Sequence, residues 1–187
     1  MQIKKIIKMF EKGSVMVCGM KGRGKDLLMG NIIARRKLPY VSNVNYGGQH
    51  FPFEYSKIDL KCNYNQLIKG DVPFYEFPYP KETDIYLSDC GVYFPSQYCN
   101  ELNRDYKSLP IFIALSRHLS GGGCRVHSNA QYCGRVWDKL REQQDFWIYA
   151  NWCKVLFGKI VIQKVTIYDK YESALSHIKP NRIHLFF

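Results

Sequence analysis

The hydrophobic and polar positions of this chain change their period several times, and each change predicts a new element. In MQIKKIIKMFEK (residues 1–12), isoleucines and a phenylalanine recur at helical spacing while lysines fall largely on the other side, which predicts a basic amphipathic helix. Gly13 is expected to end that helix. The apolar run SVMVC (residues 14–18) then predicts a strand, and residues 25–36 have helical character without proline.

The same alternation continues toward the end of the chain. Residues 47–81 lack a clear period and are expected to be irregular, with one short helix at 64–69. Further helices are expected at 97–106, from Pro110 through IFIALSRHL, and in RVWDKLREQ (135–143). Further strands are expected in LPYVSNVNY (38–46), DIYLSD (84–89, a central strand), CRVHSNAQ (124–131) and DFWIYANW (145–152). The segment KVLFGKIVIQKVTIYDK (154–170) predicts a hairpin that turns at Phe157 and Gly158.

This order predicts an α/β fold with a mainly parallel β-sheet flanked by helices and a C-terminal β-hairpin extension. The 187 residues, 46% of them hydrophobic, suffice for one sizeable core. We therefore expect a single domain over residues 1–187, with residues 1–12 as an N-terminal amphipathic helix and residues 153–187 as a β-rich extension.

The net charge of the chain indicates which classes of partner it favours. Lys and Arg outnumber Asp and Glu by 27 to 16, which gives a formal net charge of +11. Such an excess favours a polyanionic partner or an acidic membrane surface. The N-terminal helix has two readings, since its apolar side would cover the end of the core or lie on a membrane or a neighbouring subunit. No run reaches the roughly 18 apolar residues of a membrane span, and no signal peptide is apparent.

The seven cysteines form an odd set without a C-x-x-C pair. The sequence therefore predicts neither a zinc site nor a disulfide framework, and reduced thiols in a cytosol fit best.

A glycine-rich stretch, GMKGRGKD (residues 19–26), lies between a predicted strand and a predicted helix. It matches a phosphate-binding P-loop at every fixed position except the last, where Ser or Thr is usual. Such a loop surrounds phosphates with backbone N–H groups at the positive end of a helix, and Lys25 would reach the β and γ phosphates. The alternative is a basic turn before a helix. The expected nucleotide-binding residues are Gly19, Met20, Lys21, Gly22, Arg23, Gly24, Lys25, Asp26 and Leu27.

The residue in the unusual position is Asp26. Carboxylates suit Mg²⁺, so Asp26 would ligate the ion directly, at the cost of bringing negative charge toward the phosphates. We expect a steeper metal dependence of ATP binding than an ordinary P-loop shows. The rival interpretation is that Asp26 only stabilises the positive end of the helix.

Asp89 closes the run DIYLSD and is placed like the magnesium-binding acid of a Walker B strand. The alternative is an aspartate that caps the next turn. Related motors follow this acid with a glutamate that polarises the attacking water, and here the next residue is Cys90. Gln131 ends the following strand, where a polar residue would sense the γ phosphate, although polar residues end strands in any fold. Nucleotide binding is thus better supported than hydrolysis.

Arginines are candidates for fingers that act on a neighbouring subunit's site. Of Arg117, Arg125, Arg135 and Arg141 we favour Arg117 and Arg141. The histidines lack metal-ligand spacing and are read as structural. The aromatic stretches FPFEY, FYEFPY and FWIYANW would stack on single-stranded bases, but core and subunit packing are the favoured reading.

Together, GMKGRGKDLL, DIYLSDCGVYFPS, LSRHLSGGG, VHSNAQ and RVWDKLREQ resemble in order and spacing the zonula occludens toxin-like (Zot) family, the assembly ATPases of filamentous phages. The resemblance covers residues 14–152. It implies a P-loop ATPase of the DNA-pumping motor group that uses ATP and Mg²⁺. Lys25, Asp89 and Gln131 fall on family motif positions, whereas Asp26 and Cys90 depart from them at positions that bear on hydrolysis.

The resemblance also implies partners: single-stranded DNA, phage coat or membrane assembly proteins, and further copies of the chain in a homo-oligomeric ring. The expected location is the host cytoplasm, peripheral at the inner membrane. Two alternatives stand beside a DNA-extruding or packaging motor. One is a nucleotide-gated scaffold that binds DNA or coat protein with little hydrolysis. The other is a small nucleotide kinase, which would need an arginine-rich lid that the sequence does not clearly contain.

Overall fold

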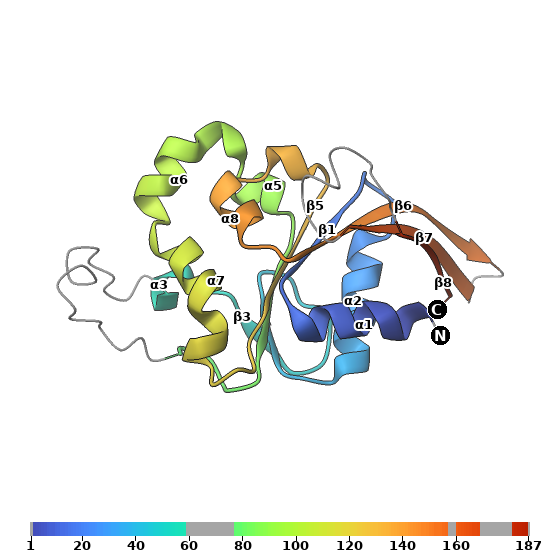
Figure 1. The fold of residues 1–187 in the computed structure, drawn as a ribbon, viewed down its shortest axis with the longest axis horizontal. Coiled ribbons are helices and arrows are strands. Elements are labelled where there is room, and N and C mark those ends of the chain that lie inside the picture. Colours follow the sequence, from blue (N-terminus) through green and yellow to red (C-terminus); the bar gives the residue numbers. More distant parts are fainter. Residues whose placement is uncertain (1, 59–76, 157–159, 169–180, 187) are drawn as a thin grey trace.

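A computed structural model describes residues 2–58, 77–156, 160–168 and 181–186, and it contains one eight-stranded sheet in the order β3-β2-β4-β5-β1-β6-β7-β8 (Figure 1). The strands are β1 (Val15–Cys18), β2 (Tyr40–Ser42), β3 (His50–Pro52), β4 (Asp84–Leu87), β5 (Val126–Ala130), β6 (Phe146–Leu156), β7 (Ile160–Tyr168) and β8 (Asn181–Phe186). The helices are α1 (Gln2–Lys12), α2 (Lys25–Arg36), α3 (Tyr55–Ile58), α5 (Cys90–Tyr93), α6 (Cys99–Asp105), α7 (Ser108–Leu119) and α8 (Asp138–Glu142), with 3-10 turns η1 (Ser96–Tyr98) and η2 (Cys133–Arg135).

The sheet confirms the predicted architecture. Strands β3, β2, β4, β5, β1 and β6 are parallel neighbours, and β7 and β8 continue the sheet in antiparallel pairing. Because β1 lies between β5 and β6, the loop after β1 opens at the middle of the carboxyl edge. Ligands of open parallel sheets bind at that edge.

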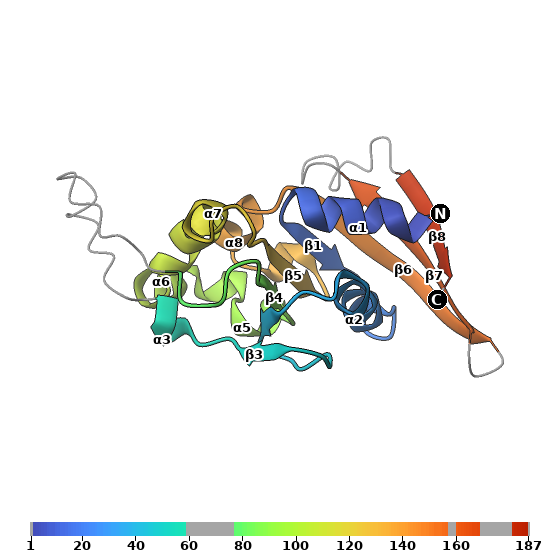
Figure 2. The same cartoon turned by 90° about the horizontal axis from the view of Figure 1, so that it is seen from below.

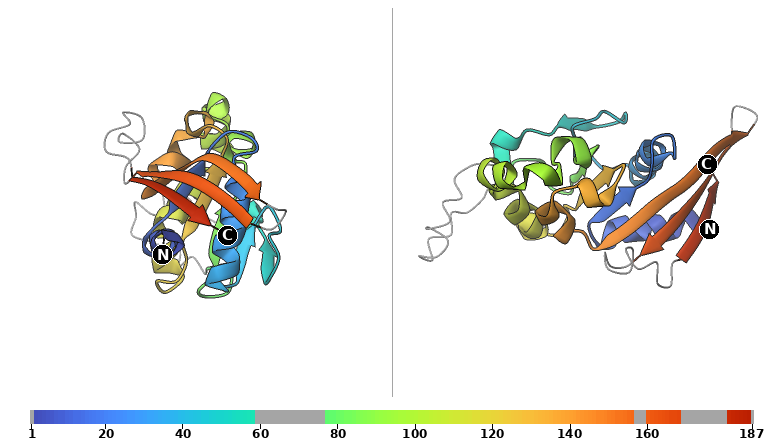
Figure 3. Two further views of the ribbon diagram at one scale, coloured as in Figure 1. Left: turned by 90° about the vertical axis from the view of Figure 1, so that its right-hand side faces the viewer. Right: turned by 90° about the horizontal axis from the view of Figure 1, so that it is seen from above.

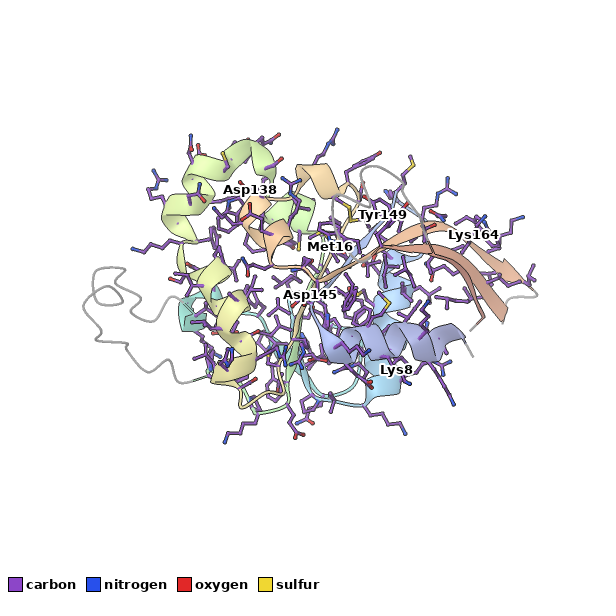
Figure 4. All side chains as sticks on the ribbon, in the orientation of Figure 1. Lys8, Met16, Asp138, Asp145, Tyr149 and Lys164 are labelled. Carbon is purple, nitrogen blue, oxygen red and sulfur yellow. A yellow bond between two sulfur atoms is a disulfide. The ribbon has the colours of Figure 1, made fainter. Side chains whose placement is uncertain are left out.

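Alternation along the central strands divides the core into two layers. Val15 and Val17 of β1 pack with α1 and α2 on one face. Met16 and Cys18 pack with α5, α6, α7 and α8 on the other face, and Figure 4 marks Met16 near the centre of the molecule. All four β1 side chains are fully buried. Burial on both faces is why this strand reads as a continuous apolar run.

The packing of α1 decides where the apolar side of the N-terminal helix lies. Its Ile6 and Phe10 are fully buried in the core layer that also contains Leu185 of β8, while Lys4, Lys5 and Lys8 are exposed. The backbone N–H of Gly13 donates to the Met9 carbonyl at 3.0 Å and closes the last turn of the helix. The apolar side of α1 therefore covers the core, and its lysines form an outward-facing row.

Several predicted boundaries were wrong. DFWIYANW and the first arm of the hairpin form one continuous strand, β6, with a bulge between Ala150 and Trp152, because pairing with β1 and then with β7 keeps the backbone extended. Figures 2 and 3 show β6 and β7 reaching past the helical layers. The short elements β3, α3 and α5 were not predicted, since elements of three or four residues carry no clear period. The helix expected at 64–69 lies outside the described residues.

The cysteine expectation is also corrected. Cys18 and Cys133 form a disulfide with a Cα–Cα distance of 6.1 Å across 115 residues of sequence. Cys18 ends β1 and Cys133 follows β5, so the parallel pairing of β1 with β5 brings them together. Spacing along the chain gives no sign of such a pair. Among the described residues, no helix is long and apolar enough to span a bilayer.

Candidate nucleotide-binding site

The glycine-rich loop occupies the predicted place between β1 and α2. Its Gly19 N–H donates to Ala130 of β5 at 3.2 Å, and its Arg23 N–H donates to Met20 at 3.2 Å. Gly22 and Gly24 adopt φ of 77° and 80°, a conformation that glycine adopts readily. Gly24 precedes α2 without a side-chain cap, so the N–H groups of the first helical turn point out of the helix without partners and favour an anion.

Lys25 is the first residue of α2 and is only 5% exposed. Within the described part of the chain, its ammonium forms no ion pair. A charge that is largely removed from water is stabilised by an opposite charge beside it. A cation in that condition beside open amide groups is suited to a phosphate.

A side chain of strand β7 hydrogen-bonds to the backbone of the glycine-rich loop. The side-chain amide of Gln163 donates to the carbonyls of Arg23 and Gly24, both at 2.9 Å, and Gln163 is fully buried. A Cβ on Gly24 would lie 2.9 Å from the Gln163 Nε2 atom, so that glycine also permits the close approach. Gln163 was not predicted as a site residue, because its only signal in the sequence is a polar residue inside the apolar run IVIQKVTIY.

Asp26 lies at the centre of a polar network. Its Oδ1 atom accepts hydrogen bonds from the Asn129 amide at 3.0 Å and from the Tyr46 hydroxyl at 3.4 Å. Tyr46 also shares a hydrogen bond with the hydroxyl of Ser88, toward which the Asn129 amide lies at 3.3 Å. Burial is the main reason that the pKa of Tyr46 rises to about 12. The phenol therefore stays protonated, and the Asp26 carboxylate remains exposed on its other side.

Asn129 joins the two predicted metal ligands. Its amide group binds Asp26, and its Oδ1 atom accepts the backbone N–H of Asp89 at 2.9 Å. Asn43 exchanges two hydrogen bonds with the backbone of Ser88, at 2.8 and 2.9 Å. These amides fix the end of β4 against β2 and β5. Asn129, Asn43 and Tyr46 were missed in the sequence because their roles depend on contacts between distant strands.

Asp89 follows β4 with a left-handed φ of 51°. It is half-buried and lines a small pocket together with Gln131, Arg135 and Tyr132. The structure thus brings Asp89 and Gln131 together at the carboxyl edge, as the sequence predicted. Magnesium would suit this edge, because Asp26 contacts Asn129 through its side chain, Asp89 contacts it through its backbone N–H, and carboxylate oxygens suit the ion.

Cys90 does not face this site. It is fully buried in the core layer under α5, and its thiol donates to the Leu87 carbonyl at 3.2 Å. Burial raises the pKa of the thiol well above its usual value. Cys90 is a core residue and offers the pocket no polarising group.

The favoured arginines are not beside the loop. Arg117 is exposed near the end of α7, where it lowers the pKa of Arg125 after the larger effect of burial. The backbone N–H of Arg125 binds Asp84 at the amino end of β4, so Arg117 lies at the opposite edge of the sheet. Arg141 is half-buried in α8. The arginine that lines the pocket is Arg135, whose guanidinium lies 5.0 Å from the centre of the Tyr132 ring.

Solved structures share this architecture. The genome packaging NTPase B204 from Sulfolobus turreted icosahedral virus 2, in complex with AMP, matches with a TM-score of 0.51 at 12% identity over 91% of this chain and 96% of that chain. The DNA-packaging ATPase B204 from Sulfolobus Turreted Icosahedral Virus matches with a TM-score of 0.51 at 13% identity, over 91% and 96% of the two chains.

The N-terminal domain of zonular occludens toxin from Neisseria meningitidis has a TM-score of 0.49 at 10% identity, over 94% of this chain and 93% of that chain. No protein-family model and no curated protein matches the sequence. The matches to the two packaging NTPases cover 91% of this chain and 96% of each of theirs, and they support the fold. The chain has the fold of a P-loop NTPase.

Proposed function

We propose that this chain binds ATP with magnesium at the loop between β1 and α2 and hydrolyses it. The observation that carries the proposal is Lys25, a buried cation without a partner in the described structure, at the start of a helix with an uncapped first turn. Gly22 and Gly24 keep the backbone open to a phosphate. Asp26 would hold magnesium, which supplies positive charge to neutralise the phosphates.

The process that this ATPase serves is, in our proposal, the extrusion or packaging of phage DNA during virion assembly. The solved relatives in fold are genome-packaging NTPases, one of them in complex with AMP. The net charge of +11 suits a nucleic acid backbone. The proposal includes a homo-oligomeric ring, single-stranded DNA and coat or membrane assembly proteins as partners, and a site in the host cytoplasm at the inner membrane.

A second function is favoured by one specific observation. Cys90 is buried and leaves the position after Asp89 without an acid, so hydrolysis would be slow if Asp89 serves only as a metal ligand. In that case the chain is a nucleotide-gated scaffold that binds DNA or coat protein.

The first test is ATP binding by calorimetry, with Mg²⁺ and with EDTA, for the wild type and Lys25→Ala. Lys81→Ala is the matched control, because Lys81 is exposed and precedes β4 at the opposite edge of the sheet. We expect Lys25→Ala to lose binding and Lys81→Ala to keep it. Equal binding by both variants would refute the nucleotide site.

The second test is ATP turnover with and without single-stranded DNA, at two salt concentrations. A motor turns over ATP faster with DNA and loses DNA affinity as salt rises, because phosphate contacts release counterions. Binding of ATP without turnover would favour the scaffold. Phosphorylation of a small acceptor without salt dependence would favour a nucleotide kinase.

A further inference from the structure

We propose that the two protein positions of the P-loop magnesium site carry exchanged side-chain types: Asp26 of the loop supplies the carboxylate, and Ser88 after β4 supplies the hydroxyl. Asp89 then serves as the acid that polarises the attacking water. The inference rests on the proposed function and assigns residues within it. In an ordinary P-loop NTPase the loop supplies a hydroxyl and the Walker B strand supplies a carboxylate. Here the loop supplies the carboxylate of Asp26, and the strand supplies the hydroxyl of Ser88.

Contacts in the structure carry this assignment. Asp26 Oδ1 and Ser88 Oγ share two neighbours, the Tyr46 hydroxyl and the Asn129 amide. Asp89 approaches this group through its backbone, whose N–H donates to Asn129 Oδ1 at 2.9 Å. Ser88 is therefore the residue after β4 whose side chain faces the P-loop residue, and Asp89 is one position further along.

Charge balance explains why the exchange is tolerable. One carboxylate and one hydroxyl face each other in either arrangement, so the formal charge beside the ion is the same. The change from hydroxyl to Asp26 alone would place two carboxylates in contact if β4 kept an acid, and like charges at that separation repel. Ser88 is 2% exposed, and Asn129 and Tyr46 donate to the Asp26 oxygen that faces it.

The exchange gives Asp89 a different task. Asp89 lines the pocket with Gln131 and Arg135, and it precedes a residue whose side chain is buried in the core. In hydrolysis, the water oxygen bonds to the γ-phosphorus, and the bond from that phosphorus to the β–γ bridging oxygen breaks with its electron pair left on ADP. Asp89 is placed to orient that water and to accept its proton, as general-base carboxylates do. The acid that is absent at Cys90 is present one residue earlier.

The test is a reciprocal exchange read out by ATP affinity at several magnesium concentrations. Asp26→Ser leaves two hydroxyls, and Ser88→Asp leaves two carboxylates, so each single variant should bind Mg·ATP at least about tenfold more weakly. The double variant Asp26→Ser/Ser88→Asp restores one of each and should bind within about threefold of the wild type. Additive losses in the double variant would overturn the exchange.

Two further variants keep the test decisive if the larger side chain at position 88 disturbs folding. Asp26→Asn preserves shape, and its ATP affinity should no longer rise with Mg²⁺, whereas Asp105→Asn on the surface of α6 should behave as the wild type. Asp89→Asn should keep Mg·ATP affinity within about threefold and lose turnover at least about 100-fold. Loss of affinity in Asp89→Asn with full magnesium dependence in Asp26→Asn would overturn the assignment. A wild type that binds no ATP with either Mg²⁺ or EDTA would instead refute the proposed function.

Discussion

Two polar clusters occupy opposite ends of β4 and β5, and they differ in whether a charged side chain has an opposite charge of the described structure beside it. At the amino ends, the buried Asp84 carboxylate binds the Arg36 guanidinium at 2.6 Å, the Arg125 backbone N–H at 3.1 Å and the Tyr86 hydroxyl at 3.3 Å. At the carboxyl ends, Lys25 is 5% exposed and has no ion pair within the described structure.

The difference separates a structural charge from a functional one. Asp84 is surrounded by donors of its own chain, so its charge is balanced in the folded state and has no capacity for a ligand. Lys25 is largely buried and has no opposite charge beside it in the described structure, so a bound phosphate would supply that charge. Residue type and burial alone would not distinguish the two clusters, because both contain charged side chains below a tenth exposed.

Removal of Asp84 should have the largest effect on stability. Asp84→Ala leaves Arg36 buried without its carboxylate, so the free energy of unfolding should fall by about 3–5 kcal/mol. Urea denaturation measures this loss. The exposed pair partner Asp105 is the control, and Asp105→Ala should produce no measurable change. A loss for Asp84→Ala no larger than the control's would show that its cluster is not structural.

Lys25→Met should give the opposite result. Because the variant removes an unpaired buried charge and keeps an unbranched side chain, the unfolding free energy without nucleotide should stay the same or rise. ATP affinity should fall about 100-fold, which corresponds to about 2.8 kcal/mol. Thermal denaturation with and without Mg·ATP measures both. A large drop in stability without nucleotide would mean that Lys25 has a structural role.

Gln163→Leu should make the glycine-rich loop less well ordered for binding ATP. The change removes two hydrogen bonds to the Arg23 and Gly24 carbonyls, each worth about 1 kcal/mol. ATP affinity should fall about tenfold. Thr166→Val on the same strand is the matched control, because it removes a hydrogen bond to Asn151 that does not reach the loop. If both variants bind ATP equally well, β7 does not position the loop.

The amino-end cluster should also make stability depend mildly on pH. Burial lowers the pKa of His127 below its usual value, and Asp84 opposes that shift only in part. His127 is neutral in the folded state while the unfolded chain takes up a proton near its ordinary pKa. Stability is thus complete above about pH 7 and falls below the unfolded pKa of about 6.5, by at most about 1.4 kcal/mol per pH unit.

Urea denaturation at pH 7.5 and pH 5.5 tests that sign. His118→Gln, a change of an exposed histidine on α7, should leave the pH difference intact, whereas His127→Gln should reduce it. A wild type that is more stable at pH 5.5 would contradict the assignment of a neutral buried His127.

The sequence by itself determined the α/β class, the loop at residues 19–26, and the strands that lead to Asp89 and Gln131. Each of these depends on a local pattern: a continuous apolar run, a helical period or a glycine spacing. Helix α2 was predicted with the bounds it has, Lys25–Arg36. Local patterns fix local backbone, so these elements could be predicted without knowledge of the rest of the chain.

Only the tertiary structure decided which side chains meet. Asn129, Ser88 and Tyr46 come to Asp26 from three different segments, and Gln163 reaches the loop from a strand about 140 residues later. The direction of Cys90 into the core and the pairing of Cys18 with Cys133 likewise follow from the order of the strands in the sheet. Contacts between distant segments leave no period in the sequence, because they depend on how separate elements pack rather than on the residues beside them.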